Sequence, residues 1–165
     1  MPSVSMNGGR FSIRITYETS QDIESNSSTV RVSNVEVKSN QNDDSKCWVT
    51  GRVWVQGREA VWLELSGSVQ CGTTLSDSYS GKGSSWPGWH SYTVKAEHQD
   101  DGTLDLEIKA YVEVYAVSNA RLMGLVNSTV YRTLPAIPRA SGIQAAGVTL
   151  GQPMTITLNR VGNLS

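Results

Sequence analysis

The sequence lacks long apolar runs, and it lacks the helical spacing of apolar residues. No stretch of about 18 consecutive apolar residues occurs, so we expect no membrane-spanning helix. No segment repeats its apolar residues at the helical period over three turns, which argues against an α-helical domain. The opening residues, MPSVSMNGGR, have neither the charged nor the apolar region of a secretory signal peptide. We therefore expect a soluble chain that is made in a cytoplasm.

The chain also lacks an excess of charge of either sign. Its 14 Lys and Arg residues are balanced by 15 Asp and Glu residues, which leaves a formal net charge of −1. Proteins that bind nucleic acids usually carry a basic surface, because contacts from Lys and Arg to phosphates supply much of the affinity. We expect no nucleic-acid partner.

Motifs for catalysis and for transition-metal binding are missing as well. The chain has two histidines and two cysteines, and it has no GxSxG, HExxH or paired-cysteine pattern. His90 and His98 show no zinc-ligand spacing with Cys47 and Cys71. No nucleophile with its base and no working pair of carboxylates stands out. We therefore expect no enzymatic activity.

Two acidic pairs, Asp43-Asp44 and Asp100-Asp101, lie in predicted turns. Aspartate is favoured in turns because its side chain bonds the backbone nearby, so we expect a structural role for both pairs. A calcium ion at the segment HQDDGT, completed by a neighbouring loop, is the alternative, since carboxylates and carbonyls suit a hard cation. One loop alone supplies too few oxygen ligands, and we expect no cofactor.

The two cysteines, Cys47 and Cys71, flank a predicted hairpin with its turn near Gly57-Arg58. Pairing outward from this turn brings them within a few residues of facing each other. A cross-strand disulfide is therefore an alternative if the protein later meets an oxidising medium. We expect two reduced, half-buried thiols, because the cytoplasm keeps cysteines reduced.

What the sequence has in abundance is alternation of apolar and polar residues with a period of two, which predicts strands buried on one face. The clearest case is the segment 104–116, in which every second residue from Leu104 to Ala116 is apolar. The segment from Phe11 to Tyr17 repeats the pattern. A third segment changes phase at Ser33-Asn34, which predicts a β-bulge there.

Further strands are predicted at residues 47–56, 60–70, 74–79, 90–98 and 126–134. The segments between them are rich in turn formers, and Asp101-Gly102 between two alternating runs predicts a hairpin. About eight strands without a helix predict an all-β fold, an antiparallel β-sandwich of jelly-roll or immunoglobulin-like kind.

The sequence changes character after Leu134, where LPAIPRASGIQAAG combines two prolines with small residues. Proline removes ladder donors, so this segment predicts an extended connector. Alternation returns at Met154, Ile156 and Leu158, but one or two strands cannot bury a core of their own. We therefore expect a β-sandwich domain at 1–134, a proline-containing linker at 135–146, and the incomplete start of a second β module at 147–165.

Three tryptophans, Trp48, Trp54 and Trp62, lie in two predicted neighbouring strands. Trp54 and Trp62 fall nearly opposite when these strands are paired outward from the turn. We expect core or cross-strand aromatic packing, because large aromatics dominate core energetics. A sheet face that stacks sugar rings is the alternative.

Trp86 and Trp89 stand in a different setting, within the stretch SSWPGWH. Glycine, proline and serine surround them, so this loop can hardly bury both indoles by regular strand pairing. Exposed aromatics on the loops of a rigid scaffold tend to bind ligands, and an indole face suits sugar rings and protein partners. Capping one end of the sandwich is the alternative. The candidate ligand-binding residues are Trp86, Trp89 and His90, with Tyr111 and Tyr115 as further candidates.

Three phrases carry a resemblance to a known family. They are GSSWPGWHSYTVKAEHQDDGTLDLEIKAYVEV, YRTLPAIPRAS and VTLGQPMTITLNR, which together cover most of the chain from about residue 84 to residue 160. They resemble minor structural proteins of tailed bacteriophages (siphophages) that infect Gram-positive bacteria. In these proteins a turn leads to a strand ending in tHnaDGtk, matched here at Glu97–Thr103 with one residue of difference around Gln99-Asp100. A tiPRAS joint, matched at Ala136–Ser141, precedes the phrase tlGsamtItinR, matched at Thr149–Arg160, which opens an immunoglobulin-like domain.

The resemblance implies a virion component of the tail tip, baseplate or fibre, made in the bacterial host cytoplasm and built from sandwich modules in series. Its partners would be other tail proteins and further copies of the chain. Its ligand would be a host cell-wall polysaccharide, bound by Trp86 and Trp89. The resemblance assigns no catalytic residue. A carbohydrate-binding module of a larger glycan-active protein is the alternative function.

Overall fold

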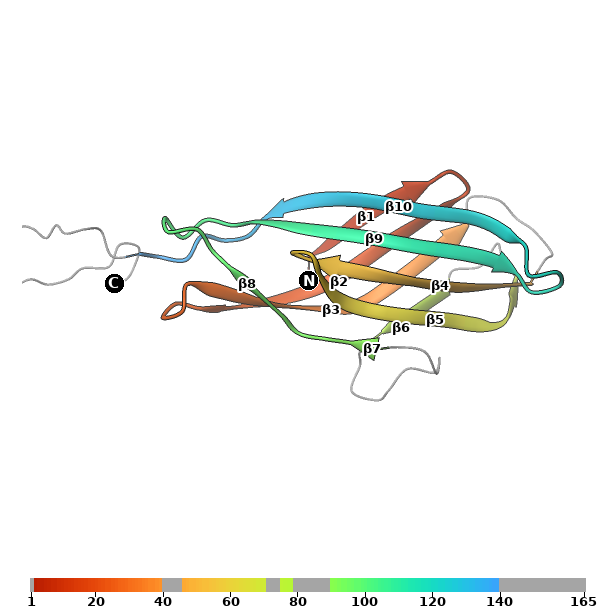
Figure 1. Ribbon diagram of the computed structural model, residues 1–165, viewed down its shortest axis with the longest axis horizontal. Helices are drawn as coiled ribbons and strands as arrows, with labels where there is room; N and C mark the ends of the chain where they lie inside the picture. Colours follow the sequence, from red (N-terminus) through yellow and green to blue (C-terminus); the bar gives the residue numbers. More distant parts are fainter. Residues whose placement is uncertain (1, 40–45, 71–74, 79–89, 140–165) are drawn as a thin grey trace, which may run out of the picture.

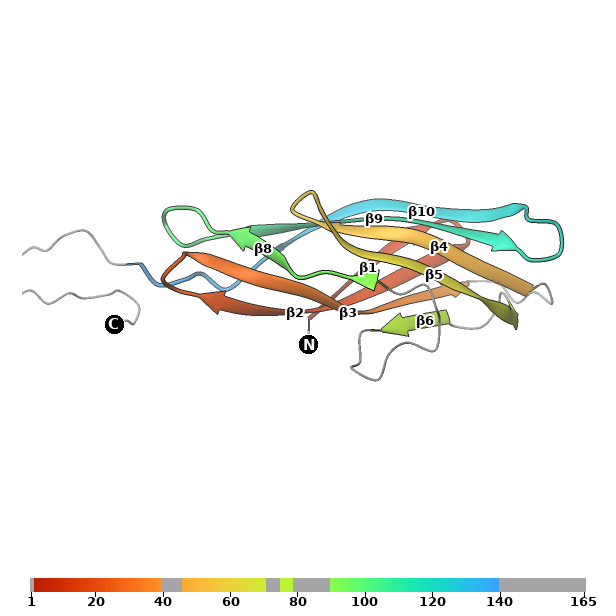
Figure 2. The ribbon, with the colours of Figure 1, turned by 60° about the horizontal axis from the view of Figure 1, so that its bottom comes forward.

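The computed structural model describes residues 2–39, 46–70, 75–78 and 90–139, with side chains described outside 65–78. Within this part of the chain all regular structure is β, in two antiparallel sheets that pack face to face (Figures 1 and 2). The predicted all-β sandwich is therefore confirmed. The predicted second module at 147–165 and the linker from residue 140 onward lie outside the described residues.

The first sheet has β1 (Ser3–Gly8), β2 (Phe11–Asp22) and β3 (Ser27–Ser39) in chain order, and β3 also pairs with β6 (Leu75–Ser78) and β8 (Val94–Glu97). The second sheet runs in the order β10 (Leu122–Thr133), β9 (Asp105–Ala116), β4 (Lys46–Val55), β5 (Arg58–Gln70) and β7 (His90–Ser91). Strand β4 thus lies between the β9 and β5 strands and belongs to the middle of its sheet (Figure 1).

Alternate residues of both sheets face each other and form one apolar core, as the period-two pattern predicts. On β2 the inward residues are Phe11, Ile13, Ile15 and Tyr17, and every predicted inward position from Leu104 to Ala116 is buried. The predicted bulge is present as well. Thr16 pairs with Asn34 and Tyr17 with Val32, so Ser33 is the extra residue, and its hydroxyl donates to the Thr16 carbonyl at 3.2 Å.

Two sequence-based expectations are wrong in their connectivity. The segment 90–98 is not one strand, because β7 pairs with β5 in the second sheet and β8 pairs with β3 in the first. The turn at Asp101-Gly102 does form, with the Gly102 amide donating to the Gln99 carbonyl at 2.8 Å. The flanking strands β8 and β9 lie in different sheets, however, so this turn is a sheet-to-sheet connection and not a hairpin.

The chain that follows β10 stays on the sandwich for several residues. The Leu134 amide donates to the Leu104 carbonyl, and the Ile137 amide donates to the Gly102 carbonyl, both at 2.9 Å. The Gln21 side chain donates to the Pro135 carbonyl at 2.8 Å. Ile137 is 1% exposed. The packed body therefore extends past the predicted domain end at residue 134 and includes the first residues of the predicted linker.

Candidate functional site

The outward face of the second sheet carries most of the aromatic residues whose side chains are described. Val49, Val53 and Val55 of β4 point inward and are buried, so Trp48 and Trp54, at alternating positions, point away from the core. The aromatic residues on this face are Trp48, Trp54, Trp62, His90, Tyr111, Tyr115 and Tyr131. Of the two placements expected for Trp48, Trp54 and Trp62, burial in the core does not occur, whereas cross-strand aromatic stacking does occur for Trp48 and Trp62. Trp62 is 37% exposed, and the other two are half-buried.

Strand register brings five residues of this face into one row across all five strands. His90 pairs with Trp62, Trp62 with Arg52, Arg52 with Tyr111, and Tyr111 with Asn127. Two predicted site residues, His90 and Tyr111, thus lie in the same row. Between them lie Trp62, which the sequence indicated only through the alternative of a sugar-stacking sheet face, and Arg52, which was not predicted. We call the segment of this row from Tyr111 to His90 the aromatic row.

A register shift in the β4–β5 hairpin decides which residues meet in the row. Trp54 pairs with Glu59, whereas Val53 pairs with Val61, so the shift falls at Ala60. The prediction that Trp54 and Trp62 lie nearly opposite is wrong, because the turn is at Gln56-Gly57, one residue earlier than predicted, which pairs Trp54 with Glu59. The shift at Ala60 then places Trp62 opposite Arg52.

Three side chains of the aromatic row, those of Arg52, Trp62 and His90, contact one another. The rings of Trp62 and His90 stack with their centroids 4.9 Å apart and an interplanar angle of 18°. The Arg52 guanidinium carbon lies 5.9 Å from the centre of the Trp62 ring, and its Nε lies 3.5 Å from a carboxylate oxygen of Glu59. An arginine over an indole face is a favourable cation–π arrangement. These contacts restrict the Trp62 side chain from both neighbouring strands.

A hollow of about 260 Å³ lies over β4 beside the Trp62 side chain. Its lining residues are Thr50, Gly51, Arg52, Trp54, Trp62, Tyr111 and Glu113. The Tyr111 hydroxyl donates to Glu113 at 3.2 Å, and the Lys109 ammonium lies 5.6 Å from the centre of the Trp54 ring. The hollow therefore combines three aromatic side chains with hydrogen-bonding groups of both kinds, donors and acceptors.

Tyr115 lies outside this hollow. It stacks on Trp48, with centroids 4.5 Å apart and an interplanar angle of 13°. The predicted cross-strand aromatic packing is thus confirmed for Trp48, with Tyr115 as its partner. The predicted site residues Trp86 and Trp89 lie outside the described residues.

Three tyrosines of this face have a raised pKa: Tyr111 and Tyr131 chiefly because of neighbouring carboxylates, and Tyr115 chiefly because of burial, with Glu113 adding to it. The negative charge of Glu113, together with the hydrogen bond to it, raises the pKa of Tyr111. On β10 the hydrogen bond from Tyr131 to Glu107, at 3.0 Å, raises the pKa of Tyr131, and the Glu107 charge adds to this. The phenols of Tyr111 and Tyr131 therefore stay neutral hydrogen-bond donors to a higher pH than a free tyrosine.

We expect that Glu113→Gln lowers the pKa of Tyr111 toward its ordinary value of about 10 and leaves that of Tyr131 unchanged. The folded chain keeps this proton to a higher pH than the unfolded chain, so stability falls as pH rises above about 10. The Gln variant should lose part of that dependence. A spectroscopic titration of tyrosinate measures both effects, and Glu107→Gln is the matched control, acting on Tyr131 alone. An unchanged Tyr111 in Glu113→Gln would contradict this electrostatic coupling.

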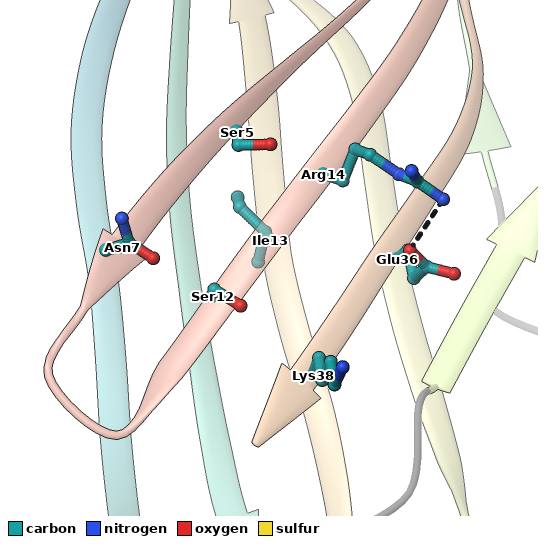
Figure 3. A pocket seen from close by; sticks show the side chains of 7 residues that line it. All are labelled: Ser5, Asn7, Ser12, Ile13, Arg14, Glu36 and Lys38. Atoms are coloured by element: carbon teal, nitrogen blue, oxygen red, sulfur yellow. Dashed lines mark ion pairs between the residues drawn. The ribbon is translucent and has the colours of Figure 1, made fainter. Parts of the chain in front are cut away.

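The outward face of the first sheet also has a hollow, of about 490 Å³, but of different character (Figure 3). It is lined by Ser5, Asn7, Ser12, Ile13, Arg14, Glu36 and Lys38, with Arg14 and Glu36 in an ion pair at 3.0 Å. No aromatic side chain lines it. This face therefore provides polar control residues far from the aromatic row, on the opposite sheet.

The carboxylate of Asp101 makes hydrogen bonds within its own turn. The Asp101 carboxylate accepts from the Thr103 hydroxyl at 2.6 Å and from the Thr103 amide at 3.0 Å, and these bonds lower the pKa of Asp101. Among the described residues no three His, Cys, Asp or Glu side chains form a metal-binding group. Asp43 and Asp44 lie outside the described residues, as does Cys71. Cys47 is buried on β4.

The described part of the chain contains no helix that could cross a membrane. Comparison of the chain with protein-family models, with curated proteins and with solved structures found no match.

Proposed function

We propose that this chain is a virion structural module of a bacteriophage tail that attaches to the host surface by binding cell-wall polysaccharide on the outward face of its second sheet. The observation that supports this binding role is the hollow lined by Tyr111, Trp54 and Trp62 together with polar side chains. The tail setting rests on the resemblance of the segments around Asp101-Gly102 and Pro138-Arg139 to siphophage structural proteins. In that setting the partners are other tail proteins and further copies of the chain.

The chemistry of the hollow suits a sugar ring. A pyranose has an apolar face of C–H groups, which packs well on an aromatic plane, and a rim of hydroxyls that both donate and accept hydrogen bonds. Trp62 and Tyr111 provide the planes, and they keep 37% and 36% of their surface exposed. Arg52 provides donors, Glu113 provides acceptors, and Thr50 provides both.

A carbohydrate-binding module of a larger glycan-active protein is the second candidate, because the same hollow would serve it. The neighbouring coding regions distinguish the two. Genes for tape-measure and distal-tail proteins favour the tail module, and a hydrolase domain in the same chain favours the second candidate.

We expect Trp62→Ala to weaken binding to isolated Gram-positive cell walls by about tenfold or more, because removal of a central aromatic contact often costs at least about 1.4 kcal/mol of binding free energy. Sedimentation of the fluorescently labelled protein with a panel of walls measures this. Lys38→Ala, on the opposite face, is the control and should bind like the parent chain. Equal binding by the parent and Trp62→Ala would contradict the proposed face.

The hypothesis that Trp86 and Trp89 bind the ligand is tested in the same assay with a Trp86→Ala, Trp89→Ala double variant. Loss of binding there together with loss in Trp62→Ala would assign both segments to one site. Loss in the double variant alone would move the site from the sheet face to the loop.

A further inference from the structure

The charges around the hollow do not favour an anionic ligand. Arg52 and Lys109 are the cationic side chains there, and three carboxylates accompany them: Glu59 and Glu64 on β5 and Glu113 on β9. Glu59 is ion-paired with Arg52, and Glu64 lies opposite Thr50 in the register. A polyanion such as a teichoic acid would require a cationic excess to offset its own charge. Uncharged hydroxyls instead match this mixture of donors and acceptors.

The aromatic planes are arranged across the strands. Tyr111 and Trp62 lie in one row with β4 between them, a separation of two strand spacings, about 9.5 Å. This separation is close to the length of two sugar residues in an extended, equatorially linked chain. His90 extends the row by one further strand.

The direction along β4 is less suitable for a ligand. Trp48 and Trp54 lie six residues apart on this strand, about 20 Å, with no aromatic residue between them on their face. Trp48 stacks on Tyr115 much as Trp62 stacks on His90, so coverage of one ring face does not distinguish the two directions. An extended ligand that follows β4 would meet fewer aromatic side chains over the same length than one that follows the aromatic row.

From the charge balance and the row together we infer that the ligand is an uncharged polysaccharide, bound with its chain across the strands between Tyr111 and His90. This inference rests on the proposed function and specifies its substrate class. The sugar residues stack against Tyr111 and Trp62, and Arg52 and Glu113 bond the hydroxyls between them.

The test uses the full chain and the polysaccharides of a cell wall that it binds, separated by anion exchange into an uncharged and an anionic fraction. Titration calorimetry of each fraction should show binding of the uncharged fraction, with an affinity that changes less than twofold between low and high salt. Binding confined to the anionic fraction, with an affinity that falls steeply with salt, would overturn the inference. It would leave the wall-binding role in place.

Variants test the direction of the bound chain. Trp62→Ala and Tyr111→Ala should each weaken binding of the uncharged fraction by about tenfold or more. Trp48→Ala, an aromatic residue of the same face outside the row, should change it less than twofold. An equal loss in Trp48→Ala and Trp62→Ala would overturn the crosswise direction. If neither Trp62→Ala nor Tyr111→Ala weakens wall binding, the proposed face itself is wrong, which is a different result from a wrong ligand class.

Discussion

Replacement of Phe11 by alanine is expected to lower the free energy of unfolding by about 3–5 kcal/mol. Phe11, the chain's only phenylalanine, begins β2 and is 1% exposed in the core between the sheets. A Cβ atom built on Gly124 of β10 would overlap the Phe11 ring, so this ring spans from the first sheet to the second. Its removal leaves a cavity where β2 meets β10. Chemical unfolding followed by tryptophan fluorescence measures the loss.

Ser12→Ala is the control for this prediction, because Ser12 is the next residue of β2 and faces outward. Its effect should stay within about 0.5 kcal/mol. The close contact also predicts a coupling. Gly124→Ala alone should destabilise by about 1–3 kcal/mol through overpacking against Phe11, and much less in a Phe11→Leu background. Additive effects of Gly124→Ala and Phe11→Leu would contradict this contact.

The sequence predicts a strand well where one face of the strand is buried in the core and the other is exposed to solvent. The segment from Leu104 to Ala116 alternates over its whole length, and the change of phase at Ser33 marks the bulge, because both features are local. Strand β1 was not predicted, although Val4 and Met6 alternate and are buried, because two apolar residues in a six-residue segment are too few to establish the period.

Pairing between distant strands was not predictable from one sequence. Nothing local in the segment 90–98 indicates that its two halves belong to different sheets, since the break at Tyr92-Thr93 depends on what each half pairs with. The placement of β4 between β9 and β5 is likewise a long-range feature. The aromatic row depends on both, and this is why the sequence indicated Trp62 only as an alternative and did not indicate Arg52.

A local signal for the outward tryptophans did exist. On β4 the apolar residues Val49, Val53 and Val55 occupy odd-numbered positions, which lie on one face of the strand. Trp48 and Trp54 occupy even-numbered positions on the other face, together with the polar Thr50 and Arg52. Alternation alone therefore places these tryptophans on the wet face, against the general tendency of large aromatics to be buried. When alternation places a large aromatic residue on the solvent-facing side of a strand, a binding face is the hypothesis to test. An exposed indole gives up the free energy of burial, and binding a ligand there recovers part of it.

The second large effect is expected at Gly102, where Gly102→Ala should destabilise the protein by about 3 kcal/mol or more. Gly102 has φ of 89°, a conformation that strains alanine by about 1–3 kcal/mol. A Cβ atom there would also meet the carbonyl oxygen of Ile137, adding an overpacking penalty of similar size. The Gly102 carbonyl accepts hydrogen bonds from the His98 ring at 2.7 Å and from the Ile137 amide at 2.9 Å.

Gly57→Ala is a matched control, because Gly57 has φ of 76° but no atom within 4 Å of its added Cβ. It carries the conformational strain alone, so the difference between the two variants measures the contact with Ile137. Hydrogen exchange at the Ile137 amide should also become faster in Gly102→Ala and stay unchanged in Gly57→Ala, since only the first substitution displaces the chain that follows β10. Equal destabilisation by the two substitutions would mean that Gly102 does not hold this segment. A clear excess for Gly102 would mean that the turn between β8 and β9 holds the segment around Ile137 against the sandwich.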